Sequence, residues 1–308
     1  MFDFFLRRTV QAAVSIAGVL TLIFFALQLS GDPVLLMVPV GASPDDIALV
    51  RRSLGLDEPV LIQYFRYVFD LARLHLGYSI VQNVPVASII ADRMFYTLAL
   101  AVAAMLFALS FGVVIGVFIA VRGNSPVGRC LASIVLVGQS MPTFWSGIVL
   151  ILVFAVWLGW LPASGALGPS SIVMPALALG FVSMATFARI TRMAVVDELS
   201  KEYVRTARSK GMTMSRIIVQ HVLRNASIPI IAIAALETAN LLTGSIIIET
   251  VFAWPGLGQV TVQALSARDF PVVQGVVLVG ALCAIGLNMI ADLSYALVDP
   301  RVRRGKRI

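Results

Sequence analysis

The sequence predicts an all-α, polytopic membrane protein with six transmembrane helices and a long external insertion between the first two. Hydrophobic residues make up 59% of the 308 residues and charged residues only 13%, with a mean hydropathy of +0.95. This composition is too apolar for a water-soluble fold. Six apolar runs are each long enough, at about 20 residues, to cross a bilayer as a helix. The Lys and Arg residues gather mainly at those ends of the runs that lie on one side of the membrane.

The first apolar run covers residues 9–30 and follows Arg7 and Arg8. It exceeds the roughly 7 to 15 residues of the apolar part of a signal peptide, and no persuasive small-x-small cleavage site follows it. We therefore expect residues 1–30 to form a cytoplasmic N-terminus and a retained first span rather than a cleaved signal peptide.

Residues 31–95 mix apolar residues with charged residues of both signs and contain five prolines. Such a mixture is typical of a segment outside the membrane. We expect an extracytoplasmic insertion that contains a helix over residues 60–74.

Five further apolar runs and the segments between them predict a five-helix membrane core over residues 96–298. The first of these runs contains Gly112 and Gly116, a small-xxx-small pair that allows another helix to approach closely. The second is interrupted by Pro142. The predicted spans cover residues 96–121, 131–158, 172–196, 228–248 and 272–298.

Six spans place both termini on one side of the membrane, and seventeen of the 23 Lys and Arg residues lie on that side. Because positive residues concentrate in cytoplasmic segments, we expect both termini, including the basic tail at residues 299–308, to be cytoplasmic. The net charge of +7 is then explained by topology and lipid headgroups, without nucleic acid.

The longest polar interruption in the second half of the chain begins at residue 197 and ends at Pro229. No Pro or Gly occurs over residues 197–210, and Gly211 follows, which predicts a short helix closed by a glycine C-cap. Thr213 is a candidate N-cap for a second helix with one apolar face. That face comprises Met214, Ile217, Ile218, His221 and Val222. We call residues 197–227 the coupling segment, although the pattern alone also fits a solvated helix pair that links two spans.

The coupling segment resembles the cytoplasmic loop of ATP-binding-cassette (ABC) importer permeases, in which a Glu and small residues precede a Gly, an apolar helix and a Pro. The matching residues are Glu202, Ala207, Gly211, Ile217 and Pro229. Tyr203 and Val204 stand where two small residues are usual, as in the similar members of the family that import peptides.

Two other stretches resemble the same family. The sequence SLGLDEPVLIQYFRYV in the insertion is similar to its external segment between the first two spans. The sequence GSIIIETVFAWPGLG at residues 244–258 resembles the peptide, nickel and glutathione group of these permeases.

The resemblance implies a type I ABC importer permease fold, of the dipeptide permease B type, in a prokaryotic plasma (inner) membrane. Such a chain would form half of the translocation pathway of an ATP-driven importer of di- and oligopeptides. Its partners would be a second homologous permease subunit, two cytoplasmic ATP-binding subunits and an extracytoplasmic substrate-binding protein. The chain itself would be no enzyme and would bind no cofactor, because the partner subunits would use ATP and Mg. The exact substrate stays open among dipeptides, longer peptides, nickel complexes, glutathione and related solutes.

The resemblance also implies roles for individual residues. In the coupling segment, Tyr203, Val204 and Ala207 would give contact area to the ATPase, Glu202 and Arg205 polar contacts, and Gly211 the sharp turn. Near the external mouth, a stretch after the fifth span would gate the pathway or receive the binding protein. Its candidate residues are Glu249, Phe252, Trp254, Pro255 and Gly256.

Glu237 and Asp292 fall inside predicted spans, where an ionisable side chain that faces lipid is costly. One interpretation is proton coupling in a transporter that acts alone. A polar lining of the pathway is favoured, because no Lys or Arg of the chain is predicted at membrane depth and no inverted repeat is found.

Catalytic and metal sites are not expected. The nearest match to a phosphate-binding loop, residues 123–130, has Arg129 and Cys130 where Lys and Ser or Thr belong. Neither histidine, His75 or His221, lies in a predicted span, so a membrane-embedded Ser140 would lack a His partner. Two histidines and two cysteines without ligand spacing do not predict a metal cluster. A membrane enzyme is therefore the third alternative, after the proton-coupled transporter.

Overall fold

The computed structural model describes residues 2–29, 34, 38, 43–53, 55–73, 75–123 and 125–298, with the backbone alone for residues 2–9, 53 and 291–298. The described chain is helical, with an isolated β-bridge between Tyr78 and Pro85. It divides into two compact units. One comprises Met1–Tyr96 with Gly256–Ile285, and the other Thr97–Pro255 with Gly286–Ile308. The basic tail predicted at residues 299–308 lies outside the described residues.

Five helical stretches are long and apolar enough to cross a membrane, which confirms five of the six predicted spans. They are Val10–Leu29 within α1 (Phe2–Leu29), α5 (Val86–Arg122), Pro169–Leu199 with α8 (Val173–Leu199), Met214–Val251 with α11 (Leu223–Val251), and Phe270–Ile290 within α13 (Phe270–Val298).

The predicted third span is not one straight helix. It consists of α6 (Pro126–Ser140) and a second stretch, Thr143–Trp157, formed by α7 (Thr143–Leu150) and a π-helix (Ile151–Trp157), and the two are bent by 112°. Met141 is extended, with φ −82° and ψ 128°. A residue that precedes proline is driven out of the helical region, so Pro142 ends α6 at this point. The bent pair counts as a sixth span only if both arms belong to one crossing.

The first unit is built on α1, α3 (Pro44–Ser53), α4 (Val60–Ala72), α12 (Leu257–Ser266) and the first part of α13. The helix predicted at residues 60–74 is confirmed as α4 and ends two residues earlier. A buried apolar cluster joins side chains far apart in sequence, including Leu27, Val86, Leu257 and Val272. This packing groups residues 256–285 with the insertion. The predicted core at residues 96–298 is therefore shared between the two compact units.

A buried carboxylate also holds the first unit together. Asp269, in the turn between α12 and α13, accepts hydrogen bonds from Ser79 Oγ at 2.5 Å and from the backbone N–H of Ile80 at 3.0 Å. The turn is thereby tied to the loop that leads into α5. α5 begins at Val86, ten residues before the predicted start of the second span, and its 37 residues extend over about 55 Å. The helix therefore begins within the predicted insertion (residues 31–95) and continues into the purely apolar run.

In the second unit, α6, α7 and α11 all pack against α8. Two glycines of α5 also come close to α8: a Cβ on Gly112 would lie 2.7 Å from the carbonyl oxygen of Met184, and one on Gly116 would lie 2.5 Å from that of Ala188. The predicted small-xxx-small pair is thus confirmed as a close contact between helix backbones.

The segment that precedes α11 is continuous with it. α10 (Met214–Ile217) and a π-helical turn (Ile218–Val222) lead into α11 without a break. Pro229 therefore lies inside the helix, and the prediction that it opens the fifth span at residue 228 is wrong. A proline inside a helix lacks the N–H that would bond to the carbonyl four residues before it, but flanking turns preserve the rest of the helix.

The close contact at Gly116 makes a testable prediction. Gly116→Ala should lower the free energy of unfolding by about 1–3 kcal/mol, because the new Cβ would overlap a backbone oxygen that cannot move aside freely. The midpoint of thermal unfolding in detergent measures it. Gly280→Ala is the matched control, since Gly280 in α13 has nothing within 4 Å of its Cβ position and alanine is favoured there by about 1 kcal/mol. Equal midpoints for the two variants would contradict the contact.

Candidate functional site

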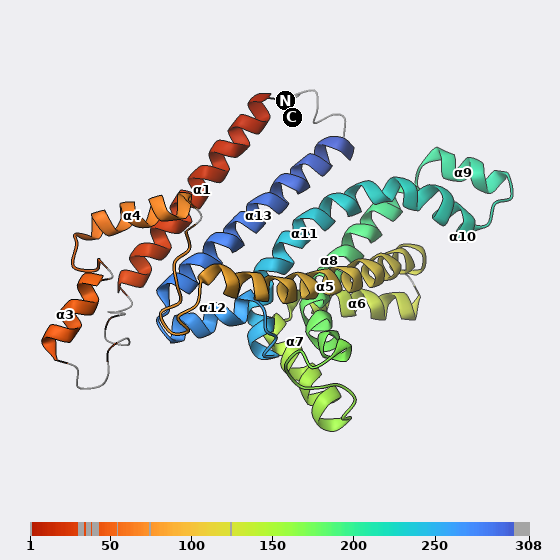
Figure 1. The fold of residues 1–308 in the computed structure, drawn as a ribbon. Helices are drawn as coiled ribbons and strands as arrows, with labels where there is room; N and C mark the ends of the chain where they lie inside the picture. Colours follow the sequence, from red (N-terminus) through yellow and green to blue (C-terminus); the bar gives the residue numbers. More distant parts are fainter. Residues whose placement is uncertain are drawn as a thin grey trace. The chain divides into compact units, whose positions relative to one another are not determined.

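The coupling segment folds as a short helix, α9 (Glu202–Ser209), and the α10 turn, at the ends of α8 and α11 (Figure 1). The prediction of one helix over residues 197–210 is wrong at its start, because α8 continues to Leu199 and carries Asp197. Ser200 Oγ bonds back to the carbonyl of Asp197 at 2.7 Å, a contact that competes with helix continuation. Lys201 then adopts an extended conformation, so α9 starts in a new direction.

Gly211 ends α9 in the predicted glycine C-cap. Its φ is +79°, its N–H donates to the carbonyl of Arg208 at 2.9 Å, and the N–H of Met212 donates to that of Ala207 at 3.2 Å. These two bonds define a Schellman motif, which needs a left-handed residue at the position of Gly211. Ala207 and Met212 meet in the same apolar cluster, the contact that usually accompanies this motif.

One side of α9 is buried within the chain itself. Val204 and Ala207 pack with Ile217 and Val222, all less than one-tenth exposed. Within the chain, Val204 and Ala207 therefore fix α9 to the bundle, and their contact with an ATPase stays a prediction. His221, predicted on the buried face, is exposed, because the π-helical turn shifts the phase of the helix.

The outward side of α9 is polar. Glu202 and Arg205 form an ion pair at 3.0 Å with both side chains mostly exposed. Thr206, Arg208 and Ser209 are exposed beside them. The exposed side of α9 is therefore charged.

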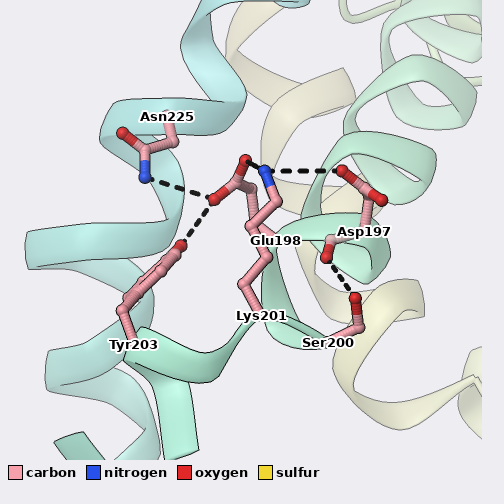
Figure 2. Close-up of polar contacts among 6 residues, drawn as sticks. All are labelled: Asp197, Glu198, Ser200, Lys201, Tyr203 and Asn225. Atoms are coloured by element: carbon pink, nitrogen blue, oxygen red, sulfur yellow. Dashed lines mark hydrogen bonds and ion pairs between the residues drawn. The ribbon is translucent and has the colours of Figure 1, made fainter. Parts of the chain in front are cut away.

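Glu198 lies at the centre of a cluster that the sequence did not reveal (Figure 2). This buried carboxylate of α8 accepts hydrogen bonds from Lys201 Nζ, from Tyr203 Oη at 2.6 Å and from Asn225 Nδ2 at 3.2 Å. Lys201 Nζ also lies 3.6 Å from Asp197. We call these five residues the Glu198 cluster. It ties α8, the 200–201 linker, α9 and α11 to one another.

The Glu198 cluster is stable at neutral pH. The hydrogen bond to Glu198, with the nearby negative charges, raises the pKa of Lys201 above its usual value. Burial, and then the bond to Glu198, raises the pKa of Tyr203. A lysine whose pKa is raised in the folded state stabilises the fold fully at a pH below its unfolded-state pKa of about 10.4. This stabilisation is lost as the pH rises through the folded-state pKa. The contribution of Lys201 to the cluster is therefore lost only in strongly alkaline solution.

Tyr203 takes part in this cluster through its hydroxyl and is half-buried. Its ring packs against the apolar cluster around Val204. A signal for Glu198 did exist in the sequence: Thr191, Val195 and Glu198 follow a spacing of four and three, and all three are buried on one face of α8.

The gate candidates form a packed turn at the end of α11. Glu249 is fully buried and accepts a hydrogen bond from Thr97 Oγ1 of α5 at 2.8 Å. Phe252 and Trp254 are buried as well, and the N–H of Trp254 donates to the carbonyl of Glu249 at 2.8 Å. Gly256 is buried and Pro255 is half-buried. Glu249, Phe252 and Trp254 are therefore packed within the chain, and their role at the external mouth stays a prediction.

Glu237, in the middle of α11, is half-buried and faces α8. Its Oε2 accepts a hydrogen bond from Ser183 Oγ at 2.6 Å. A carboxylate bonded within the bundle agrees with the expectation that it would not face lipid. The side chain of Asp292 lies outside the described residues. Among the residues that the structure describes, no three His, Cys, Asp or Glu side chains gather as metal ligands.

Comparison with protein families gives two matches that together cover nearly all of the chain. The family described as "Binding-protein-dependent transport system inner membrane component" matches residues 112–304. The family described as "Binding-prot-dependent transport system membrane comp, N-term" matches residues 1–101.

Individual relatives agree with the family matches. The chain is 39% identical to the glutathione transport system permease protein GsiC of Salmonella paratyphi A, over 98% of this chain and 99% of the relative. It is also 39% identical, over the same shares, to GsiC of Escherichia coli K12.

Solved structures support the fold. A chain of the MetNI methionine ABC transporter in an inward-facing conformation matches with a TM-score of 0.55 at 20% identity, over 69% of this chain and 97% of that chain. A chain of an amino acid ABC transporter matches with a TM-score of 0.52 at 20% identity, over 68% and 94%.

The Glu198 cluster predicts an asymmetry between two glutamates of the coupling segment. Glu198→Ala should destabilise the attachment of α9 by about 1–3 kcal/mol, because Tyr203 and Asn225 would lose their shared acceptor. Hydrogen–deuterium exchange of the α9 amides should then be faster. The control is Glu202→Ala, which removes an exposed ion pair worth about 0–1 kcal/mol. The same exchange rates in both variants would show that Glu198 does not hold α9.

Proposed function

Because the chain belongs to the family of binding-protein-dependent transport system inner membrane components, we propose that it forms half of the pathway of an ATP-driven importer of di- and oligopeptides. It is the multi-pass permease component of an ABC importer of the peptide and nickel family, in which separate subunits hydrolyse ATP. The observation that carries the finer proposal is the polar outer face of α9, presented by a helix that its own chain holds firmly.

The proposed assembly has a second homologous permease subunit, which completes the pathway, two cytoplasmic ATP-binding subunits and an extracytoplasmic substrate-binding protein. Glu202 and Arg205 contact an ATP-binding subunit, and Gly211 shapes the turn beside that contact. Tyr203 contributes the exposed part of its ring. ATP and Mg bind to the partner subunits and not to this chain. Both termini and the coupling segment lie in the cytoplasm.

The proposed coupling follows from how α9 is attached. The Glu198 cluster and the apolar cluster around Val204 join α9 to both α8 and α11. A displacement of α9 by the closing ATPases therefore moves both helices together. Ser183 lies 15 residues before Glu198 on α8, about 22 Å away along the helix, and bonds to Glu237 of α11. The motion thus reaches the middle of the bundle through two connected helices.

The proposed substrate class is a peptide-like solute. Support comes from the relatives named as glutathione transport permeases, since glutathione is itself a peptide with free amino and carboxylate groups. In this proposal Glu237 lines the pathway and supplies a hydrogen-bonding carboxylate. The competing function, a proton-coupled transporter that acts alone, would also use Glu237.

The coupling role predicts the behaviour of Gly211→Pro. Proline cannot adopt the φ of +79° at this position, so the Schellman motif should open and transport should be lost, with membrane insertion unchanged. Co-purification of an ATPase with the tagged chain, and its ATP hydrolysis, should be lost as well. The control is Gly159→Pro, at a glycine with φ +62° outside the coupling segment, which should retain the ATPase. A Gly211→Pro chain that retains a fully coupled ATPase would count against the assignment.

The pathway role predicts a change of transport in Glu237→Gln, which keeps a hydrogen-bond acceptor for Ser183 but removes the charge. Uptake of cationic and anionic dipeptides into proteoliposomes should change in relative rate while ATP dependence remains. Uptake that instead follows an imposed pH gradient without ATP, and is lost in the variant, would favour the proton-coupled transporter. No change in rate or preference would make Glu237 a structural residue.

A further inference from the structure

α4 presents three different faces, although it is only 13 residues long. At about 100° per residue, Tyr64, Tyr67 and Leu71 share one face. Gln63, Arg66 and Asp70 share a second, polar face. Leu61, Phe65 and Phe69 share a third, and we call these three residues the apolar ridge.

The first face attaches α4 to the outer half of the α1 span. Tyr64 Oη and Thr21 Oγ1 lie 2.7 Å apart in a hydrogen bond, and the rings of Phe24 and Tyr67 stack with centroids 5.5 Å apart. Gln63, at the edge of the polar face, adds a contact, since Gln28 Nε2 donates to its Oε1 at 3.0 Å. These contacts start 8 residues before the end of α1 at Leu29 and run to its last turn. Because Val10–Leu29 is an apolar span, α4 lies at the depth of the membrane and its nearby headgroups.

The apolar ridge is exposed. Leu61, Phe65 and Phe69 are 64%, 68% and 54% exposed. Three large apolar side chains in a row on one helix are unusual on a surface that meets water.

The ridge continues the exposed apolar surface of α1. The ring of Phe25 stacks on Tyr64 with centroids 5.9 Å apart, and Tyr64 meets Phe65 edge to face at 5.7 Å. Leu22 and Leu29 of α1 are exposed along the same span. The exposed surface of an apolar span faces lipid. Because the ridge continues this surface, we expect lipid to surround the ridge as well.

Charged groups border the ridge on its polar side. The guanidinium of Arg73 lies 4.0 Å above the ring of Phe69, and Arg66 pairs with Glu58 next to the polar face. Arginines at the edge of an apolar helix face can place their charge among headgroups while their stems cover apolar surface. The polar face itself lines a cavity of about 470 Å³ within the same unit, together with His75 and Gln274.

We propose that α4 is an interfacial helix that inserts the apolar ridge into the leaflet where α1 ends, between the acyl chains and the headgroups of phospholipids (Figure 1). Under the proposed topology this is the outer leaflet. The apolar and polar faces of α4 are strongly divided, as in helices that lie in the plane of a membrane surface. The helix is also too short to span the bilayer. α4 thereby anchors the insertion to the membrane instead of leaving it free above the surface.

The test uses nitroxide labels and collision with two relaxing agents, oxygen, which concentrates in hydrocarbon, and a water-soluble nickel chelate. The full-length chain carries Cys130→Ser and Cys283→Ser, so that each added cysteine is the one labelled site of this chain. It is labelled before it is combined with the subunits that accompany it. It is placed in nanodiscs of phosphatidylethanolamine and phosphatidylglycerol. Phe65→Cys and Leu61→Cys report the ridge, and Arg66→Cys, next in sequence and half-exposed, is the matched control.

The ratio of oxygen to nickel collision rates should exceed one at residues 61 and 65 and fall below one at residue 66. A ratio below one at all three positions would place the ridge in water and overturn the proposal. Low rates with both agents at residues 61 and 65 would show a protein partner over the ridge and overturn it equally. Because both ridge positions are exposed, the labels should not disturb folding, and size-exclusion profiles that match the unlabelled chain confirm this.

Discussion

The close approach of neighbouring helices to α8 is the constraint on which the second unit depends. Inside a membrane no hydrophobic effect draws helices together, so packing of their backbones must hold them. α8 buries 67% of its span within the chain, whereas α5 and the α11 span each bury 28%. Small residues along α8, such as Gly180 and Ala188, admit the backbone and side chains of α5. Any movement of α8 is therefore felt by every helix that packs on it.

The fold was predictable wherever a single property of the sequence decides the structure. The length of an apolar run predicts a span, and five spans are confirmed. Their ends were less predictable, because a helix such as α5 continues beyond its apolar part once Val86 has a cluster to join. Pro142 was visible as a break, but its bend of 112° depends on what α7 packs against. Pro229 was misread, because a membrane helix tolerates a proline that would end a helix in water.

The candidate site likewise contains residues that the local sequence predicts and residues whose role depends on tertiary contacts. Gly211 was predictable because a glycine after a polar helix has a local, conformational reason to be there. The spacing of Thr191, Val195 and Glu198 marks one face of α8, but the partners of Glu198 were not predictable, since they include Asn225, 27 residues away, and Lys201 on a linker. The burial of Val204 and Ala207 likewise requires knowing that α9 folds onto α8 and α11. Sequence pattern thus located the segment, while tertiary contacts decide which of its residues face outward.

The π-helical turn at Ile218–Val222 and Pro229 have a mechanical consequence for the two helices that meet at Glu198. α8 is a regular helix from Val173 to Leu199 and is therefore stiff. Its proline, Pro175, lies in the first turn, where it costs no hydrogen bond. α11 has both irregularities close to the same junction, where missing or shifted bonds make bending easier. A force applied at α9 would rotate α8 as one rigid helix and would bend α11 near its irregular turns.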